Sequence, residues 1–195
     1  IATSSGNTAL TNIFTDATIY VNVSNACGTV TDSIQIQIID VFPQVSPDTT
    51  ICPNDNAVLW SSGGSTYNWS PHSSLSHPDS SVTYAFPDTE TNYSVTVSNT
   101  EGCSKTLSTN VFLYDLPQVN ILTDSFQNYG TEVQLNGQSN GITYLWESLD
   151  SVSCQECLIT LAKPDETTTY ILHVTDQNGC MNSDTITIYL DGVIY

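Results

Sequence analysis

A motif of strand, turn and cysteine recurs three times, and it constrains this chain more than any other feature. The copies read IYVNVSNAC at Ile19 to Cys27, TNYSVTVSNTEGC at Thr91 to Cys103, and YILHVTDQNGC at Tyr170 to Cys180. Each alternates apolar and polar residues before a turn rich in Asn, Asp or Gly, which is typical of a half-buried β-strand entering a hairpin. The cysteines lie 76 (103 − 27) and 77 (180 − 103) residues apart. A period of that length predicts a tandem array of small β-domains.

Two matching proline junctions mark where the repeats meet. They read Phe42-Pro43-Gln44-Val45 and Leu116-Pro117-Gln118-Val119. We therefore expect units at 1–42, 43–117 and 118–195, of which 1–42 is only the C-terminal half of a repeat. Because proline fixes its own φ angle, each junction should be stiff.

Each whole unit is predicted to be a β-sandwich. Five short alternating segments in the second unit are bounded by Gly, Pro, Asn, Asp or Ser, and no stretch supports a helix of three turns. These segments are Ala57 to Ser61, Thr66 to Ser70, Ser80 to Phe86, Asn92 to Asn99 and Ser104 to Leu113. The third unit repeats the layout, with Trp146 in the place of Trp69. We expect both tryptophans to anchor the cores, because aromatic side chains dominate the energetics of small sandwiches.

The charge balance excludes several classes of partner. Lys and Arg total 2 against 20 Asp and Glu, a formal net charge of −18. Nucleic acid is therefore not expected as a partner, and anionic membrane surfaces are disfavoured. No apolar run approaches the roughly 20 residues of a membrane span, and Ile1 does not begin a signal peptide. We expect an internal or C-terminal fragment of a secreted β-rich protein.

Six cysteines in repeat register indicate an oxidising compartment. Cys52 and Cys103 are the two cysteines of the second unit, and we expect them to be bonded to each other. The third unit has no cysteine at the equivalent of Cys52, near Gln127 or Asn128, so Cys180 is expected to be free or to pair within its own unit.

The other cysteines allow several interpretations. Cys154 and Cys157 form a C-x2-C motif that could be half a zinc site, a redox motif or a local disulfide. No second ligand pair follows, and the βαβ context of a redox motif is absent, so we favour a disulfide between Cys154 and Cys157. That leaves Cys180 either free or paired with one of these two. Cys27 has no partner in its half-unit, and its partner is expected upstream of Ile1.

No residue pattern predicts catalysis or a dedicated metal site. G-x-S-x-G, H-E-x-x-H and phosphate-binding glycine loops are all missing, so we expect a non-enzyme with no catalytic residues and no cofactor. His72 and His77 lie five residues apart, but a metal site needs more than two ligands, so they are read as surface loop residues and His173 as a half-buried strand residue. The acidic turns leave Ca²⁺ as a candidate ligand, although no D-x-[DN]-x-[DN]-G loop is present.

Several motifs together resemble the PKD/Ig-like repeats of the gliding-motility-associated, type IX secreted surface proteins of Bacteroidota. The matching residues are the Thr66-Tyr67-Asn68-Trp69-Ser70-Pro71 run, Leu75-Ser76, Thr91 to Val97, and Glu101-Gly102-Cys103. In the third unit they are Ser153 to Cys157, Thr167 to Tyr170, and Asn178-Gly179-Cys180. The third unit is similar to the version that lies last before the C-terminal sorting domain of these proteins. It departs from the pattern where Glu147-Ser148 follows Trp146, since the family usually has Ser-Pro there.

This resemblance implies an all-β chain of tandem Ig-like or PKD-like sandwiches that is exported to the cell surface. The expected function is a repeat stalk or filament of a large adhesin in cell adhesion or gliding motility. Its expected partners are the type IX secretion machinery and a surface polysaccharide or other cells. The alternatives are the accessory stalk of a secreted hydrolase and a carbohydrate-binding module, which would need exposed aromatic residues in a row on one sheet face.

The resemblance also implies O-glycosylation, which in this phylum occurs at Asp followed by Ser or Thr and then by an aliphatic residue or Thr. Four positions fit that pattern, namely Ser33, Thr49, Ser151 and Thr185. A bulky sugar on an exposed strand would shield sheet edges from pairing with neighbouring stalks, which a tandem β-array needs.

Overall fold

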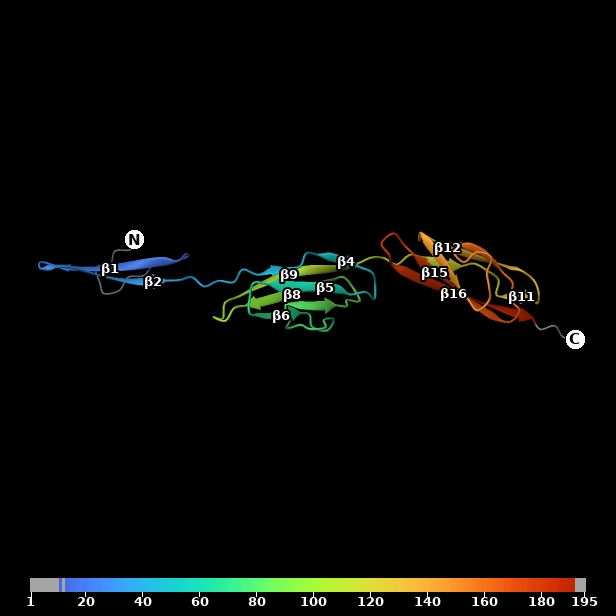
Figure 1. Cartoon of the computed structure of the whole chain (residues 1–195), viewed down its shortest axis with the longest axis horizontal. Helices are drawn as coiled ribbons and strands as arrows, with labels where there is room; N and C mark the ends of the chain where they lie inside the picture. Colours follow the sequence, from blue (N-terminus) through green and yellow to red (C-terminus); the bar gives the residue numbers. More distant parts are fainter. Residues whose placement is uncertain (1–10, 12, 192–195) are drawn as a thin grey trace.

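The computed structural model describes residues 11 and 13–191, and its secondary structure is entirely β within that part of the chain. The outermost residues of the expected first and third units, 1–10, 12 and 192–195, lie outside the described residues. The strands form an N-terminal hairpin and two sandwiches, which follow one another along the long axis of the molecule (Figure 1). The expected all-β fold of tandem Ig-like sandwiches is confirmed.

The N-terminal hairpin consists of β1 (Ala17–Asn25) and β2 (Gly28–Ile36), which pair antiparallel along their full length. We call β3 to β9 the middle sandwich. Its strands are β3 (Gln44–Val45), β4 (Thr49–Ile51), β5 (Ala57–Ser62), β6 (Thr66–Ser70), β7 (Val82–Ala85), β8 (Thr91–Ser98) and β9 (Ser104–Leu113). We call β10 to β16 the C-terminal sandwich. Its strands are β10 (Val119–Ile121), β11 (Phe126–Asn128), β12 (Val133–Ser139), β13 (Thr143–Glu147), β14 (Ile159–Ala162), β15 (Thr168–Thr175) and β16 (Met181–Asp191).

The strand order is that of an immunoglobulin-like sandwich. In the middle sandwich one sheet has the order β3-β5-β7 and the other β4-β9-β8-β6, and the C-terminal sandwich repeats both. Strands A, B and E of an immunoglobulin fold share one sheet, and C, F and G share the other. Here β3, β5 and β7 take the places of A, B and E, while β6, β8 and β9 take those of C, F and G. The additional strand β4 runs parallel to the end of β9.

Each sandwich has its own core, built around one tryptophan. Trp69 on β6 and Trp146 on β13 are fully buried, as the sequence predicted, and lie in two separate hydrophobic clusters. Immunoglobulin domains usually join strands B and F with a disulfide beneath this tryptophan. The middle sandwich instead buries Leu59 on β5 and Val95 on β8, so no disulfide crosses its core.

A buried tyrosine occupies the same place in both cores but is satisfied in only one. The Tyr93 hydroxyl shares a hydrogen bond of 2.6 Å with the Ser74 hydroxyl. The Tyr170 hydroxyl has no hydrogen-bond partner among the described residues. Burial, with a smaller contribution from the Asp150 carboxylate, raises the pKa of Tyr170 to about 12. The C-terminal sandwich therefore carries an uncompensated polar group that the middle one does not.

This difference predicts opposite effects for two identical substitutions. Tyr93→Phe should cost the middle sandwich about 1 kcal/mol of unfolding free energy, because it leaves the Ser74 hydroxyl without its hydrogen-bond partner. Tyr170→Phe should leave the C-terminal sandwich unchanged or slightly more stable, because it removes a group that is buried without a partner. Differential scanning calorimetry of the two variants checks the prediction, and equal losses would contradict it.

Candidate functional site: the disulfide junction between the sandwiches

Cys52 lies at the end of the middle sandwich where the chain leaves for the next one. It follows β4, whose last residue Ile51 is in register with Leu113 at the end of β9. The backbone nitrogen of Tyr114 donates to the Ile51 carbonyl at 2.9 Å. Cys52 then opens a turn in which Pro53 is followed by Asn54 with φ of +70°, and the Asp55 nitrogen donates back to the Cys52 carbonyl. Proline followed by a residue with positive φ is the signature of a type II turn.

Asp48 fixes the short strand that carries Cys52. Its carboxylate accepts hydrogen bonds from the Asn110 backbone nitrogen at 2.7 Å and from the Asn110 side-chain nitrogen at 3.0 Å. These bonds, the backbone one first, lower the pKa of Asp48 below its ordinary value of 3.8. Ionised Asp48 therefore holds β4 against β9.

The lowered pKa of Asp48 predicts acid sensitivity in the middle sandwich. Because the folded pKa lies below the unfolded one, the stabilisation is present above about pH 4 and is lost as the pH falls through the folded value. Asp48→Asn should lower the melting temperature of the middle sandwich at pH 7 and flatten its fall below pH 4. Thermal unfolding of the chain with both disulfides reduced, between pH 7 and pH 2, checks this, with the C-terminal sandwich as the internal control. An unchanged acid slope would contradict it.

Cys180 lies in the turn between β15 and β16. This turn is at the end of the C-terminal sandwich where the linker from the middle sandwich arrives. Asp176 organises this turn, since its side chain accepts from the backbone nitrogens of Asn178 at 2.8 Å and Cys180 at 2.9 Å. The glycine between them has φ of +86°, a conformation that favours residues without a Cβ atom. Cys180 itself is fully buried.

Cys52 and Cys180 are bonded, with their Cα atoms 5.3 Å apart, so the disulfide joins the two sandwiches to each other. The expected bond between Cys52 and Cys103 is therefore wrong, as is the expectation that Cys180 is free or pairs with Cys154 or Cys157. Cys103 lies just before the start of β9, whereas Cys52 lies beside its end. Ten extended residues separate those ends by about 33 Å, while a disulfide spans Cα atoms less than about 7 Å apart.

The disulfide is the strongest link between the sandwiches, because the extensive strand contacts all lie within one sandwich or the hairpin. It closes a loop with a sequence separation of 128 residues. Loop-closure entropy for such a length corresponds to about 4 to 5 kcal/mol against unfolding. The junction is thus covalently fixed, although the two cores are independent.

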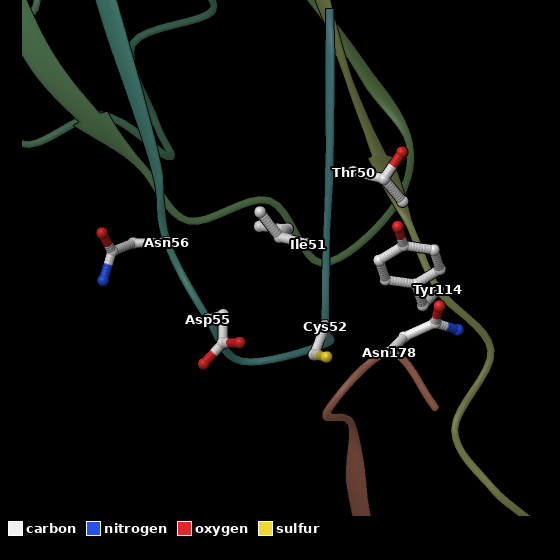
Figure 2. A pocket seen from close by; sticks show the side chains of 7 residues that line it. All are labelled: Thr50, Ile51, Cys52, Asp55, Asn56, Tyr114 and Asn178. Carbon is white, nitrogen blue, oxygen red and sulfur yellow. The ribbon is translucent and has the colours of Figure 1, made fainter. Parts of the chain in front are cut away.

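A shallow hollow of about 340 Å³ lies beside the disulfide (Figure 2). Its walls come from both sandwiches, with Tyr114 and Asp55 from the middle one and Asn178 from the C-terminal one. Asp55 is the only acidic side chain in the lining, which contains no basic or histidine side chain. The hollow therefore offers hydroxyl, amide and carboxylate groups but no cationic side chain.

Cys154 and Cys157 are bonded to each other, and this disulfide closes a short loop within the C-terminal sandwich. Trp146 reaches this loop twice, since its backbone nitrogen donates to the Gln155 carbonyl and its indole nitrogen donates to the Cys157 carbonyl, both at 2.8 Å. The middle sandwich makes the same indole contact without cysteines, from Trp69 to the Ser80 carbonyl at 2.9 Å. The C-x2-C motif therefore stiffens a loop that clamps the core tryptophan.

The described residues hold no group of three His, Cys, Asp or Glu side chains placed to bind a metal ion. His72 bonds to the Asn68 side chain and His77 to the Ser76 hydroxyl, and both are exposed. His173 is half-buried on β15 and pairs with Glu147 at 3.0 Å. Calcium binding stays a prediction.

The four glycosylation candidates differ in accessibility. Ser33, Ser151 and Thr185 are exposed, whereas Thr49 is half-buried in β4. The Asp32 side chain accepts a hydrogen bond from the Ser33 backbone nitrogen, and the Asp184 side chain accepts one from the Thr185 backbone nitrogen. Three candidates are therefore open to a modifying enzyme, and modification of any of them stays a prediction.

An exposed apolar patch covers the outer face of β5 and β7, which the sequence did not indicate. Trp60 is in register with Val82, and Val58 with Tyr84. All four side chains point away from the core, and the exposed fraction of Trp60 is 38%. The C-terminal sandwich has polar Gln134 and Asn136 on the corresponding strand β12, so only the middle sandwich presents this aromatic face.

No family model matches the sequence, and no curated protein matches it. Similar solved structures include the insect immune protein hemolin, at 13% identity and a TM-score of 0.41, covering 89% of this chain and 56% of hemolin. Dpr2 Ig1-Ig2 in complex with DIP-Theta Ig1-Ig3 is similar at 14% identity and a TM-score of 0.32, covering 90% of this chain and 73% of that chain. Murine CEACAM1b is similar at 11% identity and a TM-score of 0.32, covering 76% of this chain and 100% of its own. This chain spans just over half the length of hemolin.

Within the described residues no helix has the length and apolar character needed to span a membrane.

Proposed function

We propose that this chain is part of an extracellular, non-catalytic repeat stalk of a cell-surface adhesin, serving in adhesion or gliding. The observation that carries the proposal is the Cys52–Cys180 disulfide, because it braces the connection between consecutive sandwiches. A crosslink at that place restricts bending between units and has no evident use in a chain whose domains act singly. Stable disulfides also fit an oxidising, extracellular location.

The composition supports the same role. A net charge of −18 with few charged residues of the opposite sign makes neighbouring stalks repel one another. The resemblance to the repeats of Bacteroidota surface proteins adds export by the type IX machinery, and contact with surface polysaccharide or other cells. In this proposal the sandwiches hold an adhesive head away from the cell and carry the load placed on it.

Surface labelling and gene deletion test the proposal together. An antibody against residues 41–191 should label intact cells of the native organism, and deletion of the gene should reduce attachment or gliding. A strain blocked in outer-membrane export serves as the control, since it should retain the antigen inside. Antigen that becomes accessible only after lysis would overturn the proposal. Loss of a secreted hydrolytic activity, with attachment unchanged, would favour the accessory stalk of a hydrolase.

Carbohydrate binding is a second candidate function, favoured by the exposed aromatic residues on β5 and β7. Trp60 and Tyr84 lie on one sheet face, and flat aromatic rings on such a face can stack against sugar rings. The other two tryptophans of the chain are buried, so a ligand-induced change in tryptophan fluorescence would report on Trp60. This makes the candidate directly measurable.

Titration with soluble polysaccharides tests this candidate. Binding through the patch predicts a fluorescence change that disappears in Trp60→Asn, which installs the residue found at the corresponding position of the C-terminal sandwich. Affinity electrophoresis of the same variant should show the loss without relying on fluorescence. Equal migration of the original chain and the variant in gels with and without polysaccharide would exclude the patch as a sugar site.

Glycosylation of the stalk is a further part of the proposal. Sugars at Ser33, Ser151 or Thr185 would cover exposed strands and loops of the N-terminal hairpin and the C-terminal sandwich. Protein from the native source should then have a mass above that of the bare chain, which is 21.2 kDa for this stretch. Intact-mass measurement decides it, because a mass equal to that of the bare chain would rule the modification out.

A further inference from the structure

The turn that holds Cys103 is built like the turn that holds Cys180. In the middle sandwich the Asn99 nitrogen donates to the Cys103 carbonyl at 3.0 Å, and the Cys103 nitrogen donates to the Asn99 side chain at 2.9 Å. In the C-terminal sandwich the same two bonds join Asp176 and Cys180 at 3.0 and 2.9 Å. The glycines before the cysteines have φ of +88° and +86°. The two cysteines therefore occupy equivalent places in their sandwiches.

Cys103 also faces the segment that arrives from the preceding unit. Its sulfur lies 3.3 Å from the carbonyl oxygen of Ile39. Two residues on, the Lys105 ammonium pairs with Asp40 at 2.6 Å and lies 5.0 Å from the centre of the Phe42 ring. At the other junction Asn182 stands in the place of Lys105 and donates to the carbonyl of Pro117, in the linker from the middle sandwich, at 2.9 Å. Both cysteine turns thus lie against the entering linker.

The N-terminal hairpin has the sequence of the last two strands of a sandwich, but it lacks the other strands within the described residues. Val23 lies in the same Val-Ser-Asn sequence as Val97, yet Val23 is 68% exposed and Val97 is fully buried. Ile34 on β2 is 60% exposed as well. An apolar hairpin of this kind needs the strands of a first half-sandwich to cover it. In the middle sandwich that half contains β4 and Cys52, beside the end of the last strand.

We propose that Cys103 is the site of a second inter-unit disulfide, with a cysteine that takes the place of Cys52 in the sandwich completed by the N-terminal hairpin. Such a cysteine would lie beside the end of β2, next to the linker that Cys103 faces. Cys27 lies at the corresponding end of the hairpin in a shorter turn, where its nitrogen donates to the Asn25 side chain at 2.8 Å, and it takes the corresponding role toward the unit before. This inference rests on the proposed tandem stalk and adds the disulfides that link its consecutive units.

Bond formation requires a disulfide oxidant, such as the oxidised form of a thiol-disulfide oxidoreductase. The thiolate of one cysteine attacks the oxidant disulfide, and the second thiolate then attacks the resulting mixed disulfide. One sulfur-sulfur bond forms in the stalk and one is lost in the oxidant. The oxidant takes up two electrons and two protons, and it leaves as a dithiol.

The two crosslinks would interlock, because Cys103 lies in sequence between Cys52 and Cys180. Each disulfide would therefore end inside the loop that the next one closes, which makes the array a continuous covalent ladder. The C-terminal sandwich has Asn128 and Tyr129 at the two places that can correspond to Cys52, 76 (128 − 52) and 77 (129 − 52) residues further on, and neither is a cysteine. The ladder consequently has no cysteine at that position to continue it beyond the C-terminal sandwich.

Disulfide mapping of the full-length protein from its native source tests the inference. Free thiols are blocked before digestion, and the enzymes cut at Asp and Glu, since the chain has only two Lys and Arg residues in total. The expected result is a Cys103 peptide crosslinked to a peptide from upstream of Ile1, in the same sample as the Cys52–Cys180 pair. A Cys103→Ser variant should free that upstream cysteine and leave the Cys52–Cys180 pair intact.

The possible failures are distinguishable. A blocked, free Cys103 in a protein that has a preceding sandwich would overturn the second disulfide while leaving the stalk in place. A bond between Cys103 and Cys27 would also overturn it. A full-length sequence without any preceding sandwich would overturn both this inference and the proposed stalk.

Discussion

Pulled from its two ends, the chain should extend about 45 nm further when its disulfides are reduced than when they are oxidised. Force applied at the ends reaches Cys52, crosses the disulfide to Cys180 and leaves through the last residues. The 128 residue steps between these cysteines are bypassed, and an extended chain covers about 3.5 Å per residue. The fully extended length should therefore rise from about 24 nm to about 68 nm on reduction.

Two double variants separate this disulfide from the other one. Cys52→Ser combined with Cys180→Ser should give the long extension without any reductant. Cys154→Ser combined with Cys157→Ser should keep the short one, because that disulfide lies inside the bypassed segment. Single-molecule force spectroscopy measures both lengths. Equal extension of oxidised and reduced chains would show that the Cys52–Cys180 bond carries no load.

The placement of the disulfide suits a stalk better than a disulfide within one sandwich would. A bond inside the middle sandwich would protect that unit alone and leave the connection to its neighbour as a single strand of linker. The bond from Cys52 to Cys180 instead covers most of one sandwich, the linker at Pro117, and most of the next sandwich. Forced unfolding of either core then lengthens the chain only outside the closed loop. This is the physical reason for linking the disulfide to load-bearing.

The strands were predictable from the sequence because they depend on local alternation. The expected segments Thr66 to Ser70 and Ser104 to Leu113 match β6 and β9 at both ends, and Asn92 to Asn99 is displaced from β8 by one residue. Apolar residues at every second position are enough to indicate a half-buried strand. The buried tryptophans followed from the same pattern, together with the size of their side chains.

The disulfide partner was not predictable because it depends on how distant segments pair. Cys103 and Cys180 each follow a strand and a glycine with positive φ, in turns with the same hydrogen bonds, so either could have bonded to Cys52. The choice is made by β4, a three-residue strand that runs parallel to the end of β9 and carries Cys52 to the far end of the sandwich. Nothing in the alternation of so short a strand shows its partner or its direction.

The exposed face of β5 could not be predicted from the sequence, for a different reason. Its sequence Ala-Val-Leu-Trp is apolar at every position, so periodicity indicates a strand but does not show which side faces the core. The structure buries Ala57 and Leu59 and exposes Val58 and Trp60. The small Ala57 lies opposite Ala85 on β7, and both are buried. The inner face of this sheet thus takes small residues where the large tryptophan of β6 fills the core.

Replacing one core tryptophan should unfold one sandwich and spare the other. Trp69→Ala removes the largest side chain of the middle core, which is expected to cost about 3 to 5 kcal/mol. At roughly 0.05 to 0.15 kcal/mol per residue, a unit of about 75 residues has about 4 to 11 kcal/mol of stability, so much of it would be lost. A change of 1 kcal/mol moves the melting temperature of so small a domain by about 4 to 8 °C, so the shift should exceed about 12 °C.

The matched variant Trp146→Ala should do the same to the C-terminal sandwich, because the two tryptophans lie in separate cores. Calorimetry should show two transitions, with each variant lowering a different one. Trp69→Phe is the intermediate control, since it keeps most of the ring but loses the indole bond to the Ser80 carbonyl. The comparison is made with both disulfides reduced, because the Cys52–Cys180 loop would otherwise couple the unfolding of one sandwich to the other. A single transition lowered equally by Trp69→Ala and Trp146→Ala would show that the sandwiches unfold as one body, contrary to the independence of their cores.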